Sequence, residues 1–443
     1  MRKILIAGTM SGSGKTTVSS IIMSAFENVA PFKIGPDYID PGYHKLFTEN
    51  SSYNLDSFMF DENTLKYIFE ENSRGKDIAV IEGVMGLYDG INHTKDNFST
   101  AHTARILDVP VILVVSAKGI STSIAAEVLG FVNFDKNVNI AGVILNNVSG
   151  EKLYLSLKQA VEEYTGIECL GYIPKDENIG VESRHLGLKQ AFEVEDSAER
   201  KEFLRNTGRK YLNLKRIYEI AESSEEYNIK NPAEGLKNIF KGKRAAVARD
   251  KAFSFYYESN FDIMRYAGLE LVEFSPVHDS KVPGNVDFIY LGGGYPELYA
   301  KELAENTEMK KSITEAHEAG IPIYAECGGF IYLTKGLKNT DEKFYDFCGI
   351  FDIKIAMRKR LNMERFGYIH IDMKNGIKTK GHEFHYSEIF DNNENQCFYS
   401  IKKENGREWK CGYRKDNALA GYPHIAFYSE PEFLKFLFNQ KLP

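Results

Sequence analysis

A glycine-rich loop close to the start of the chain constrains the fold more than any other feature. The apolar run Ile4 to Ala7 leads into Gly8-Thr-Met-Ser-Gly-Ser-Gly-Lys-Thr-Thr17, and a helix-like segment follows. A strand, a glycine loop and a helix in this order are typical of a P-loop, which binds phosphate. The first glycine lies one residue further from the Gly-Lys pair than in the common pattern, so the loop is one residue longer. The sequence therefore predicts a parallel sheet with a phosphate site at the N-terminus.

The loop residues have distinct predicted roles in holding a nucleotide. Backbone N–H groups around Gly12 and Gly14 would surround phosphate oxygens, Lys15 would reach the terminal phosphates, and the Thr16 hydroxyl would bind Mg²⁺. An ordinary glycine-rich turn is the alternative, but Gly-Lys-Thr-Thr after the first strand favours phosphate binding. The predicted nucleotide-binding residues are Gly8, Thr9, Gly12, Ser13, Gly14, Lys15, Thr16, Thr17 and Asn146. Asn146 ends a later strand, where this type of sheet often offers an amide to the adenine edge and where an asparagine is also an ordinary turn residue.

Carboxylates recur close to the predicted ends of strands. Asp37 and Asp40 lie in a stretch rich in glycine and proline, which cannot continue a helix or a central strand. Glu82 ends the apolar run that starts at Ile78, and Asp89 follows it. Open α/β sheets build their sites at the carboxyl ends of strands, and a magnesium nucleotide needs acidic groups there. Each acid taken alone has the alternative role of capping a loop.

The chain divides into three segments. Apolar runs of strand length alternate with segments of helix length over residues 1–196, and the same alternation returns over residues 244–443. The stretch 197–243 is charged and poor in strands, which predicts exposed helix and a linker. The predicted fold class is therefore α/β, with two doubly wound domains joined by a helical connector.

Charge and hydropathy exclude several classes of function. The chain has 55 Lys and Arg against 62 Asp and Glu, for a net charge of −7, so nucleic-acid binding is disfavoured. Its longest apolar run, Val109 to Val115, is too short for a membrane span and resembles a buried strand. The N-terminus has no signal-peptide pattern. We therefore expect a cytoplasmic protein that binds neither nucleic acid nor membrane.

A cysteine in the second half lies in a distinctive setting. The segment Ile321-Pro-Ile-Tyr-Ala-Glu-Cys-Gly-Gly-Phe330 predicts a strand, a sharp glycine turn and a helix, the elbow that exposes a nucleophile. Cys327 would stand at its tip, where the helix end would lower the pKa of the thiol. Backbone N–H groups at Gly293 and Gly294 are the predicted oxyanion donors. A buried structural cysteine is the alternative.

Seven motifs extend these features along nearly the whole chain. They are Gly8-Thr-Met-Ser-Gly-Ser-Gly-Lys-Thr16, Gly35-Pro-Asp-Tyr-Ile-Asp40, Glu82-Gly-Val-Met-Gly-Leu-Tyr-Asp-Gly90, Arg184-His-Leu-Gly-Leu188, Leu291-Gly-Gly-Gly-Tyr-Pro-Glu297, Ala325-Glu-Cys-Gly-Gly329 and Gly381-His-Glu-Phe-His-Tyr-Ser387. In combination they resemble the cobyrinic acid a,c-diamide synthase family. The resemblance implies a dethiobiotin synthetase-like ATPase domain, with its P-loop sheet, fused to a class I glutamine amidotransferase domain.

The resemblance also implies a reaction. ATP would phosphorylate a peripheral acetate of a corrinoid precursor, and ammonia released from glutamine would displace the phosphate to leave amides at the a and c positions. The implied substrates are ATP, glutamine and the corrinoid precursor, and the implied cofactor is Mg²⁺. Lys15 and the metal would neutralise the transferring phosphoryl group.

Individual roles follow from the same resemblance. Thr16, Asp37 and Glu82 are the implied magnesium ligands. Asp40 and Asp89 are the implied catalytic acids near the acceptor carboxylate or the phosphorylated intermediate. The residues implied to contact the substrate are Tyr38, Ile39, Arg184, His185, His382 and His385.

The general base has to be chosen among histidines that follow Cys327. Class I amidotransferases carry this histidine near the C-terminus, often after a proline, and Tyr422-Pro-His therefore indicates His424. Most of that class has a glutamate two residues later, where this chain has Ala426, so the resemblance implies a cysteine–histidine dyad. Ser116 is a second departure, because the family usually has an aspartate there. His382 and His385 are expected in a substrate-facing loop, and a zinc site there is disfavoured.

Two alternatives to cobyrinate amidation remain open from the sequence. The nickel-sirohydrochlorin a,c-diamide synthase of methanogens has the same motifs and acts on a different tetrapyrrole. A nucleotide-dependent switch or partitioning ATPase with a fused binding module belongs to another class. Met10 stands where such switches carry a second lysine, which argues against them, as does the cysteine elbow. A homodimer is the expected assembly.

Overall fold

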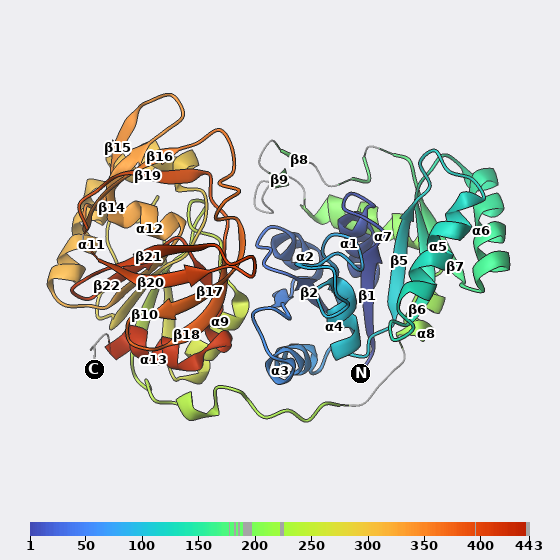
Figure 1. Cartoon of the computed structure of the whole chain (residues 1–443), viewed down its shortest axis with the longest axis horizontal. Helices are drawn as coiled ribbons and strands as arrows, with labels where there is room; N and C mark the ends of the chain where they lie inside the picture. Colours follow the sequence, from blue (N-terminus) through green and yellow to red (C-terminus); the bar gives the residue numbers. More distant parts are fainter. Residues whose placement is uncertain are drawn as a thin grey trace. The chain divides into compact units, whose positions relative to one another are not determined.

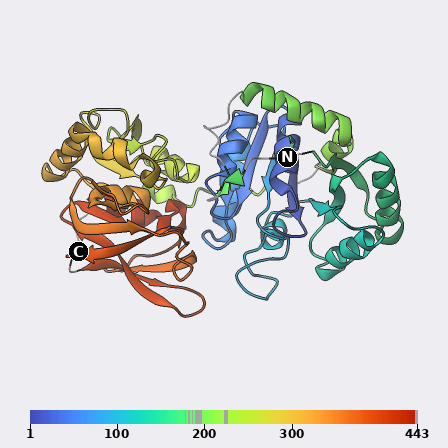
Figure 2. The same cartoon turned by 90° about the horizontal axis from the view of Figure 1, so that it is seen from above.

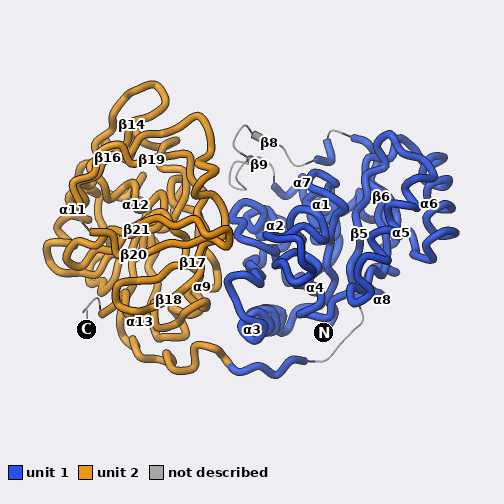
Figure 3. The backbone as a smooth tube through the Cα atoms, viewed as in Figure 1, with its two compact units in different colours: residues 1–230 blue, residues 231–443 orange. Residues whose placement is uncertain are grey.

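The computed structural model describes residues 1–176, 178–180, 183–184, 187–188, 197–221, 226–394 and 396–439. The chain forms two compact units, Met1–Lys230 and Asn231–Pro443, which Figure 3 shows in blue and orange. We call them unit 1 and unit 2. None of the helices within the described ranges is both long and apolar enough to cross a membrane.

Unit 1 is built on a parallel sheet whose strands are buried on both faces. Their spatial order is β3 (Tyr53–Leu55), β2 (Val29–Ile34), β4 (Ile78–Glu82), β1 (Lys3–Gly8), β5 (Val111–Ser116), β6 (Ile140–Val148) and β7 (Cys169–Pro174). All neighbours pair in parallel. Continuous apolar runs such as that of β1 suit this position, because helices cover both faces of a parallel sheet.

Helices connect these strands and cover the sheet (Figure 1). They are α1 (Lys15–Ala25), α2 (Asp40–Thr48), α3 (Glu62–Ser73), α4 (Thr100–Ile106), α5 (Ser123–Phe134), α6 (Glu151–Thr165), α7 (Ser197–Tyr211) and α8 (Leu214–Ile220). A short pair of strands, β8 (Ser183–Arg184) and β9 (Gly187–Leu188), precedes α7.

The helices α7 and α8 fall in the stretch where the sequence predicted an exposed connector. The structure differs, because Leu204, Leu212 and Ile217 are buried in the core that α1 and the sheet form. Gly208 of α7 lies so close to α1 that a Cβ there would be 3.0 Å from Cγ2 of Ile21. Figure 2 shows α7 in green alongside the other elements of unit 1. Both helices therefore belong to unit 1.

Unit 2 has a mixed sheet. Its strands follow the order β11 (Glu270–Phe274), β10 (Arg244–Ala248), β12 (Phe288–Leu291), β13 (Ile323–Glu326), β22 (Ala418–Gly421), β21 (Glu408–Lys415), β20 (Cys397–Lys402), β17 (Gly367–Met373), β18 (Lys378–Glu383) and β23 (His424–Ile425). Pairing is parallel from β11 to β22 and antiparallel from β22 to β23. The parallel half is the predicted α/β arrangement, and the α/β fold class is confirmed.

The remaining elements of unit 2 surround this sheet. A smaller sheet has the order β15 (Phe344–Asp346), β14 (Thr334–Lys338), β16 (Phe351–Met357) and β19 (Ser387–Asn392). The α-helices are α9 (Glu258–Tyr266), α10 (Ala300–Glu305), α11 (Thr307–Glu318), α12 (Gly328–Leu333) and α13 (Pro431–Asn439). Short 3₁₀ turns lie at Glu234–Leu236, Pro296–Tyr299 and Phe427–Ser429.

Candidate active sites

The predicted phosphate loop connects β1 to α1. Gly12 and Gly14 have φ angles of 78° and 102°, in the left-handed region that glycine tolerates best. Asn146, near the carboxyl end of β6, donates a hydrogen bond from Nδ2 to the carbonyl oxygen of Ser13 over 2.8 Å. A Cβ at Gly14 would lie 1.9 Å from the same Nδ2, so the loop needs glycine here. The side-chain amide of Asn146 thus stabilises the phosphate loop by a hydrogen bond to its backbone.

Lys15, the first residue of α1, is nearly buried. Its Nζ lies 3.3 Å from the carbonyl oxygen of Met10, within the same loop. Burial, followed by the positive charge of Lys33, lowers the pKa of Lys15 to about 8. A polyphosphate in the loop would bring negative charge to this ammonium, which is the pairing that a P-loop lysine provides.

A buried ion cluster stands beside the loop. Lys33, near the carboxyl end of β2, donates a hydrogen bond to the carboxylate of Asp40, and its Nζ lies 2.9 Å from Oε1 of Glu82. Burial alone would lower the pKa of Lys33, but these two carboxylates raise it. Burial alone would raise the pKa of Glu82, but Lys33 and a hydrogen bond with His44 lower it. The cluster therefore holds the Lys33 ammonium between Asp40 and Glu82. Burial, followed by the charge of Asp37, raises the pKa of Asp40.

His44 completes the cluster from α2. Its Nε2 lies 2.8 Å from Oε2 of Glu82, and its Nδ1 lies 2.9 Å from Oγ of Ser52. Neither His44 nor Lys33 was predicted from the sequence. The signal for Lys33 was present, because a lysine in the otherwise apolar strand β2 needs a buried anion. The contact of His44 joins residues 38 positions apart, which only the fold reveals.

The predicted magnesium ligands are partly assembled. Thr16 donates from Oγ1 to Oε1 of Glu82 over 2.7 Å, so a hydroxyl and a carboxylate oxygen stand side by side. Asp37 accepts from the backbone N–H groups of Ile39 and Asp40 through Oδ1, at 2.8 and 3.1 Å. In the part of the chain that the structure describes, no three or more His, Cys, Asp or Glu side chains are grouped to hold a metal. Thr16 and Glu82 fit Mg²⁺, which proteins usually bind through few side chains together with phosphate oxygens.

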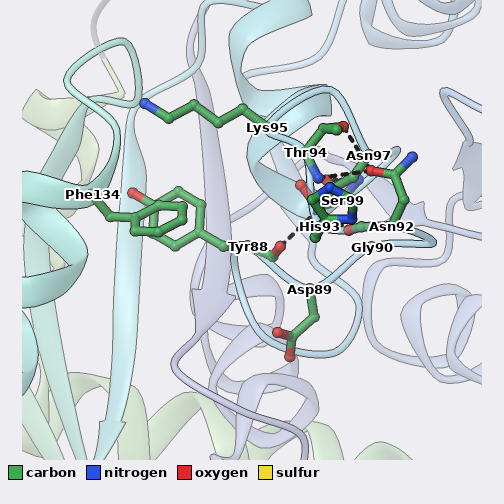
Figure 4. A pocket seen from close by; sticks show the side chains of 10 residues that line it. All are labelled: Tyr88, Asp89, Gly90, Asn92, His93, Thr94, Lys95, Asn97, Ser99 and Phe134. Atoms are coloured by element: carbon green, nitrogen blue, oxygen red, sulfur yellow. Dashed lines mark hydrogen bonds between the residues drawn. The ribbon is translucent and has the colours of Figure 1, made fainter.

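Asp89 lies in the loop after β4. Its Oδ2 accepts from the N–H of Gly86 over 2.9 Å. A cavity of about 280 Å³ adjoins it. Figure 4 shows the Asp89 carboxylate directed away from Asn92 and Thr94, which line the same cavity. Its lining residues are Tyr88, Asp89, Gly90, Asn92, His93, Thr94, Lys95, Asn97, Ser99 and Phe134.

The other residues predicted for this half are described to different extents. Tyr38 and Ile39 are half-buried just before α2. Arg184 belongs to β8, and its side chain lies outside the described part. His185 lies outside the described residues altogether. Ser116 ends β5, and its Oγ lies 3.4 Å from Nδ2 of Asn147.

In unit 2, Cys327 stands at the predicted elbow between β13 and α12. Its φ of 45° and ψ of −99° are unusual for a residue with a side chain, and such strain concentrates at functional sites. A Cβ at Gly328 would lie 3.0 Å from the backbone nitrogen of Gly294, and one at Gly329 would lie 2.3 Å from the carbonyl oxygen of Leu291. The glycines of the elbow therefore permit a close approach to the loop that follows β12.

The thiol itself is buried, and this corrects one expectation. Burial raises the pKa of Cys327, and the carboxylates of Glu297 and Glu383 raise it further. The sequence predicted a pKa lowered by the helix end, but α12 has only six residues and the desolvation of the thiolate outweighs it. Sγ lies 3.8 Å from the carbonyl oxygen of Phe384. The resting cysteine is therefore a thiol that needs a base.

The imidazole of His424 lies beside Gly293, which belongs to the loop of the predicted oxyanion donors. A Cβ at Gly293 would lie 2.3 Å from Cε1 of His424, so this glycine passes directly beside the ring. Burial, followed by the charges of His382 and His385, lowers the pKa of His424 well below its usual value. A neutral imidazole can accept a proton, as a general base must. Gly293 therefore lies against His424, and the neighbouring Gly294 lies against Gly328 of the elbow.

The other two histidines flank this site. His382 lies within β18 rather than in the predicted loop, and its ring stacks on that of His424 with a centroid distance of 4.9 Å. Burial lowers the pKa of His382 to about 3. His385 stacks on Tyr422 at 3.8 Å, and its Nδ1 lies 2.8 Å from the carbonyl oxygen of Ser387. Their predicted contact with the tetrapyrrole stays a prediction.

The two units together define a class of protein. One has a P-loop on a parallel sheet, and the other has a cysteine elbow and a histidine that both adjoin the loop of Gly293 and Gly294, as in a glutamine-dependent amide ligase. The family model for a "CobQ/CobB/MinD/ParA nucleotide binding domain" matches residues 4–188, and that for a "CobB/CobQ-like glutamine amidotransferase domain" matches residues 244–432.

Curated relatives match along the whole chain. A cobyrinate a,c-diamide synthase of Fusobacterium nucleatum is 48% identical over 99% of this chain and 100% of its own length. Those of Listeria innocua and Caldanaerobacter subterraneus are 44% and 40% identical, over 99% and 98% of this chain and 99% and 97% of theirs. The chain belongs to the cobyrinate a,c-diamide synthase family, as the motifs predicted.

Solved structures resemble parts of the chain only distantly. A glutamine amidotransferase is 13% identical, with a TM-score of 0.35 over 44% of this chain and 97% of that one. The FtsY of Physcomitrella patens chloroplasts is 14% identical, with a TM-score of 0.31 over 46% of this chain and 65% of that one.

Proposed function

We propose that the protein is an ATP-dependent, glutamine-hydrolysing ligase that converts the a and c acetate side chains of cobyrinate to amides, as part of cobalamin biosynthesis. The observation that carries this proposal is the full-length identity of 40–48% to relatives named for that activity. The two candidate sites support it, because the reaction needs one site for phosphoryl transfer and one for releasing ammonia.

Unit 1 would activate the carboxylate. An acetate is a poor acyl donor, whereas an acyl phosphate has a good leaving group. Lys15 would bind the terminal phosphates of ATP, and Mg²⁺ held by Thr16 and Glu82 would neutralise the charge of the transferring group. Asp37 is a proposed further ligand of the metal. Asp40 and Asp89 are the proposed acids near the acceptor.

The buried ion cluster supports this arrangement. The contacts of Lys33 and His44 fix both oxygens of Glu82, so its carboxylate is held in place before a nucleotide binds. Positioned charge lowers a barrier because it needs no rearrangement during the reaction. The cluster would therefore present Glu82 to the metal in a fixed orientation.

Unit 2 would release ammonia from glutamine. His424 would take the proton of the Cys327 thiol as the sulfur attacks the side-chain amide of glutamine. Backbone N–H groups at Gly293 and Gly294 are the proposed donors to the developing oxyanion. The protonated His424 would then give its proton to the leaving ammonia, and water would hydrolyse the thioester to glutamate. The ammonia would displace phosphate from the acyl phosphate made in unit 1.

A direct assay tests the proposal. The purified protein is incubated with ATP, Mg²⁺, glutamine and either cobyrinate or nickel sirohydrochlorin, and mass spectrometry counts the amides formed. We expect a diamide of cobyrinate, together with ADP, phosphate and glutamate. A faster reaction with nickel sirohydrochlorin would overturn the assigned substrate. ATP turnover that ignores both tetrapyrroles and glutamine would overturn the ligase function. A homodimer and a cytoplasmic location stay predictions.

A further inference from the structure

The residue before the cysteine carries an inference that rests on the proposed glutaminase function. Glu326, the last residue of β13, is 1% exposed, which is rare for a carboxylate. Three groups donate hydrogen bonds to it. The hydroxyl of Tyr324 and the N–H of Ile425 donate to Oε1, at 2.8 and 3.0 Å, and the hydroxyl of Tyr290 donates to Oε2 at 3.0 Å. The carboxylate is therefore fixed in one orientation.

This orientation points one oxygen at the proposed base. Oε2 of Glu326 lies 3.8 Å from Nδ1 of His424. Oε1 holds the backbone of Ile425, the residue directly after that histidine. His424 belongs to β23, which lies at the end of the sheet away from the parallel half and does not pair with β13. The side chain of Glu326 therefore connects two strands that are not neighbours in the sheet. Glu326 thus holds the backbone next to His424 and places a carboxylate oxygen near its ring.

Glu326 is also the chain neighbour of the nucleophile. The N–H of Cys327 donates to the carbonyl oxygen of Gly421 over 2.8 Å, which locks the elbow onto β22. One residue of β13 therefore sets the position of the base relative to the sulfur. Ala426 stands where the resemblance to class I amidotransferases leads one to expect a glutamate, so the chain supplies no carboxylate from that position.

We propose that Glu326 is the positioning residue that orients His424 and stabilises the imidazolium formed when His424 takes the proton of Cys327. The cysteine–histidine pair then acts with a third group, which comes from the nucleophile's own strand. With Nδ1 turned to Glu326, Nε2 is the ring nitrogen that receives the thiol proton.

The electrostatics of the site agree with this role. Burial raises the pKa of Glu326 to about 7, although three hydrogen bonds favour its charged form. A positive charge on His424 would favour the carboxylate further, since an opposite charge a few ångströms away in a buried site interacts strongly. The interaction is therefore stronger after proton transfer than before it, which is the condition for lowering a barrier.

Substitutions separate the charge of Glu326 from its size. Glu326→Gln keeps the size and removes the charge, whereas Glu326→Asp keeps the charge and shortens the side chain. For glutamine hydrolysis we expect kcat to fall on the order of 10²-fold in Glu326→Gln, with little change in KM. The loss in Glu326→Asp should be smaller. A residue that only packs gives the opposite order, because the shorter side chain leaves a cavity.

A second measurement reports the reactivity of the Cys327 thiol alone. The glutamine analogue 6-diazo-5-oxo-norleucine alkylates the cysteine of such sites, so its rate of labelling at Cys327 measures activation of the thiol. We expect labelling to slow in Glu326→Gln by the same factor as kcat. Tyr290→Phe is the matched control, because it removes one hydrogen bond to Oε2 and leaves the carboxylate facing His424. Its labelling rate should change less than about threefold.

The outcomes separate this proposal from the function it rests on. Equal losses in Glu326→Gln and Tyr290→Phe, or a larger loss in Glu326→Asp than in Glu326→Gln, would overturn the role of Glu326. Glutamine hydrolysis that survives in Cys327→Ser would overturn the glutaminase assignment itself. Synthesis with ammonium salt, which does not need this site, should stay within about twofold of wild type in each folded variant.

Discussion

The side-chain amide of Asn146 donates a hydrogen bond to the carbonyl oxygen of Ser13, 2.8 Å away and 133 positions apart in the chain. The sequence placed Asn146 at a strand end, where an amide can face either a turn or an adenine edge. The contact favours a role in holding the phosphate loop, because Nδ2 is directed to the backbone of that loop.

Asn146→Ala is therefore expected to weaken nucleotide binding without changing the preference for the base. Loss of a buried hydrogen bond costs about 1–2 kcal/mol, so KM for ATP should rise roughly fivefold to thirtyfold. KM for GTP should rise by the same factor, and steady-state kinetics with both nucleotides measures the ratio. Asn133→Ala, on the exposed face of α5, is the control. A change confined to ATP would restore the adenine-edge assignment.

Lys15→Met should separate stability from activity. Because the pKa of Lys15 is lowered to about 8, the folded, ATP-free protein holds this proton more weakly than the unfolded chain does. The resulting cost in the free energy of unfolding is present below pH 8 and disappears as the pH rises towards 10.5.

The substitution removes that cost, so we expect a gain of up to about 3 kcal/mol at pH 7 that shrinks above pH 8. This gain in the free energy of unfolding is measured from the unfolding transition of the ATP-free protein, which is the transition that ATP shifts in the wild type. Amidation should be abolished with either nitrogen source, as also in Lys15→Ala. An unchanged rate with ammonium salt would remove Lys15 from the ATP site.

Glu82→Gln should block formation of the phosphorylated intermediate. It withdraws a proposed magnesium ligand and also leaves Lys33 with one carboxylate fewer, which should lower the free energy of unfolding by about 3 kcal/mol. The measurement is ATP turnover with cobyrinate at increasing Mg²⁺ concentration. Glu62→Gln, at an exposed position of α3, is the control. Normal magnesium dependence in Glu82→Gln would show that the metal binds elsewhere.

The architecture could be predicted because local patterns determine it. Continuous apolar runs such as that of β1 require strands covered on both faces, and the glycine loop after β1 has few conformational alternatives. The family follows from motifs spread over both units. The same reasoning missed the packing of α7, because this helix is mostly polar and the few buried apolar residues such as Leu204 are not distinctive by sequence.

Only those site residues that lie within short motifs of characteristic spacing could be predicted from the sequence. Cys327 and Lys15 lie within short motifs, and their functional roles stay predictions. Lys33 reaches Glu82 across neighbouring strands, and Glu326 reaches His424 across strands that do not pair. Such contacts depend on how the sheet curves, which no local pattern encodes. The pKa of Cys327 was wrongly expected to fall because burial depends on the whole unit.

Cys327→Ser should divide the activity rather than abolish it. Glutamine-driven synthesis should be lost, whereas synthesis with ammonium salt should continue, because the acyl phosphate proposed for unit 1 does not need the cysteine. Parallel assays with the two nitrogen sources measure the split. Cys397→Ser, at a half-buried position in β20, should retain both activities. Loss of the ammonium reaction in Cys327→Ser would contradict independent chemistry in the two units.

His424→Ala and His385→Ala are expected to behave in opposite ways. The first should lose only the glutamine reaction, by about 10²-fold or more, because no base then takes the thiol proton. The second should weaken synthesis with both nitrogen sources if His385 contacts the tetrapyrrole. The same paired assays distinguish them. If His385→Ala lost only the glutamine reaction and His424→Ala kept it, the base would be His385.

The buried thiol of Cys327 has a consequence outside catalysis. Peroxide and similar oxidants attack thiolates, and burial keeps the proton on this sulfur in the resting protein. Cys327 should therefore survive oxidative exposure that would convert an exposed, low-pKa cysteine to sulfenic acid. This protection of Cys327 can be measured as the loss of glutaminase activity in dilute peroxide. We expect the loss to be slow at pH values where free cysteine is oxidised readily. A cysteine that becomes a thiolate only when a histidine takes its proton stays protonated, and therefore resistant to oxidation, in the resting protein.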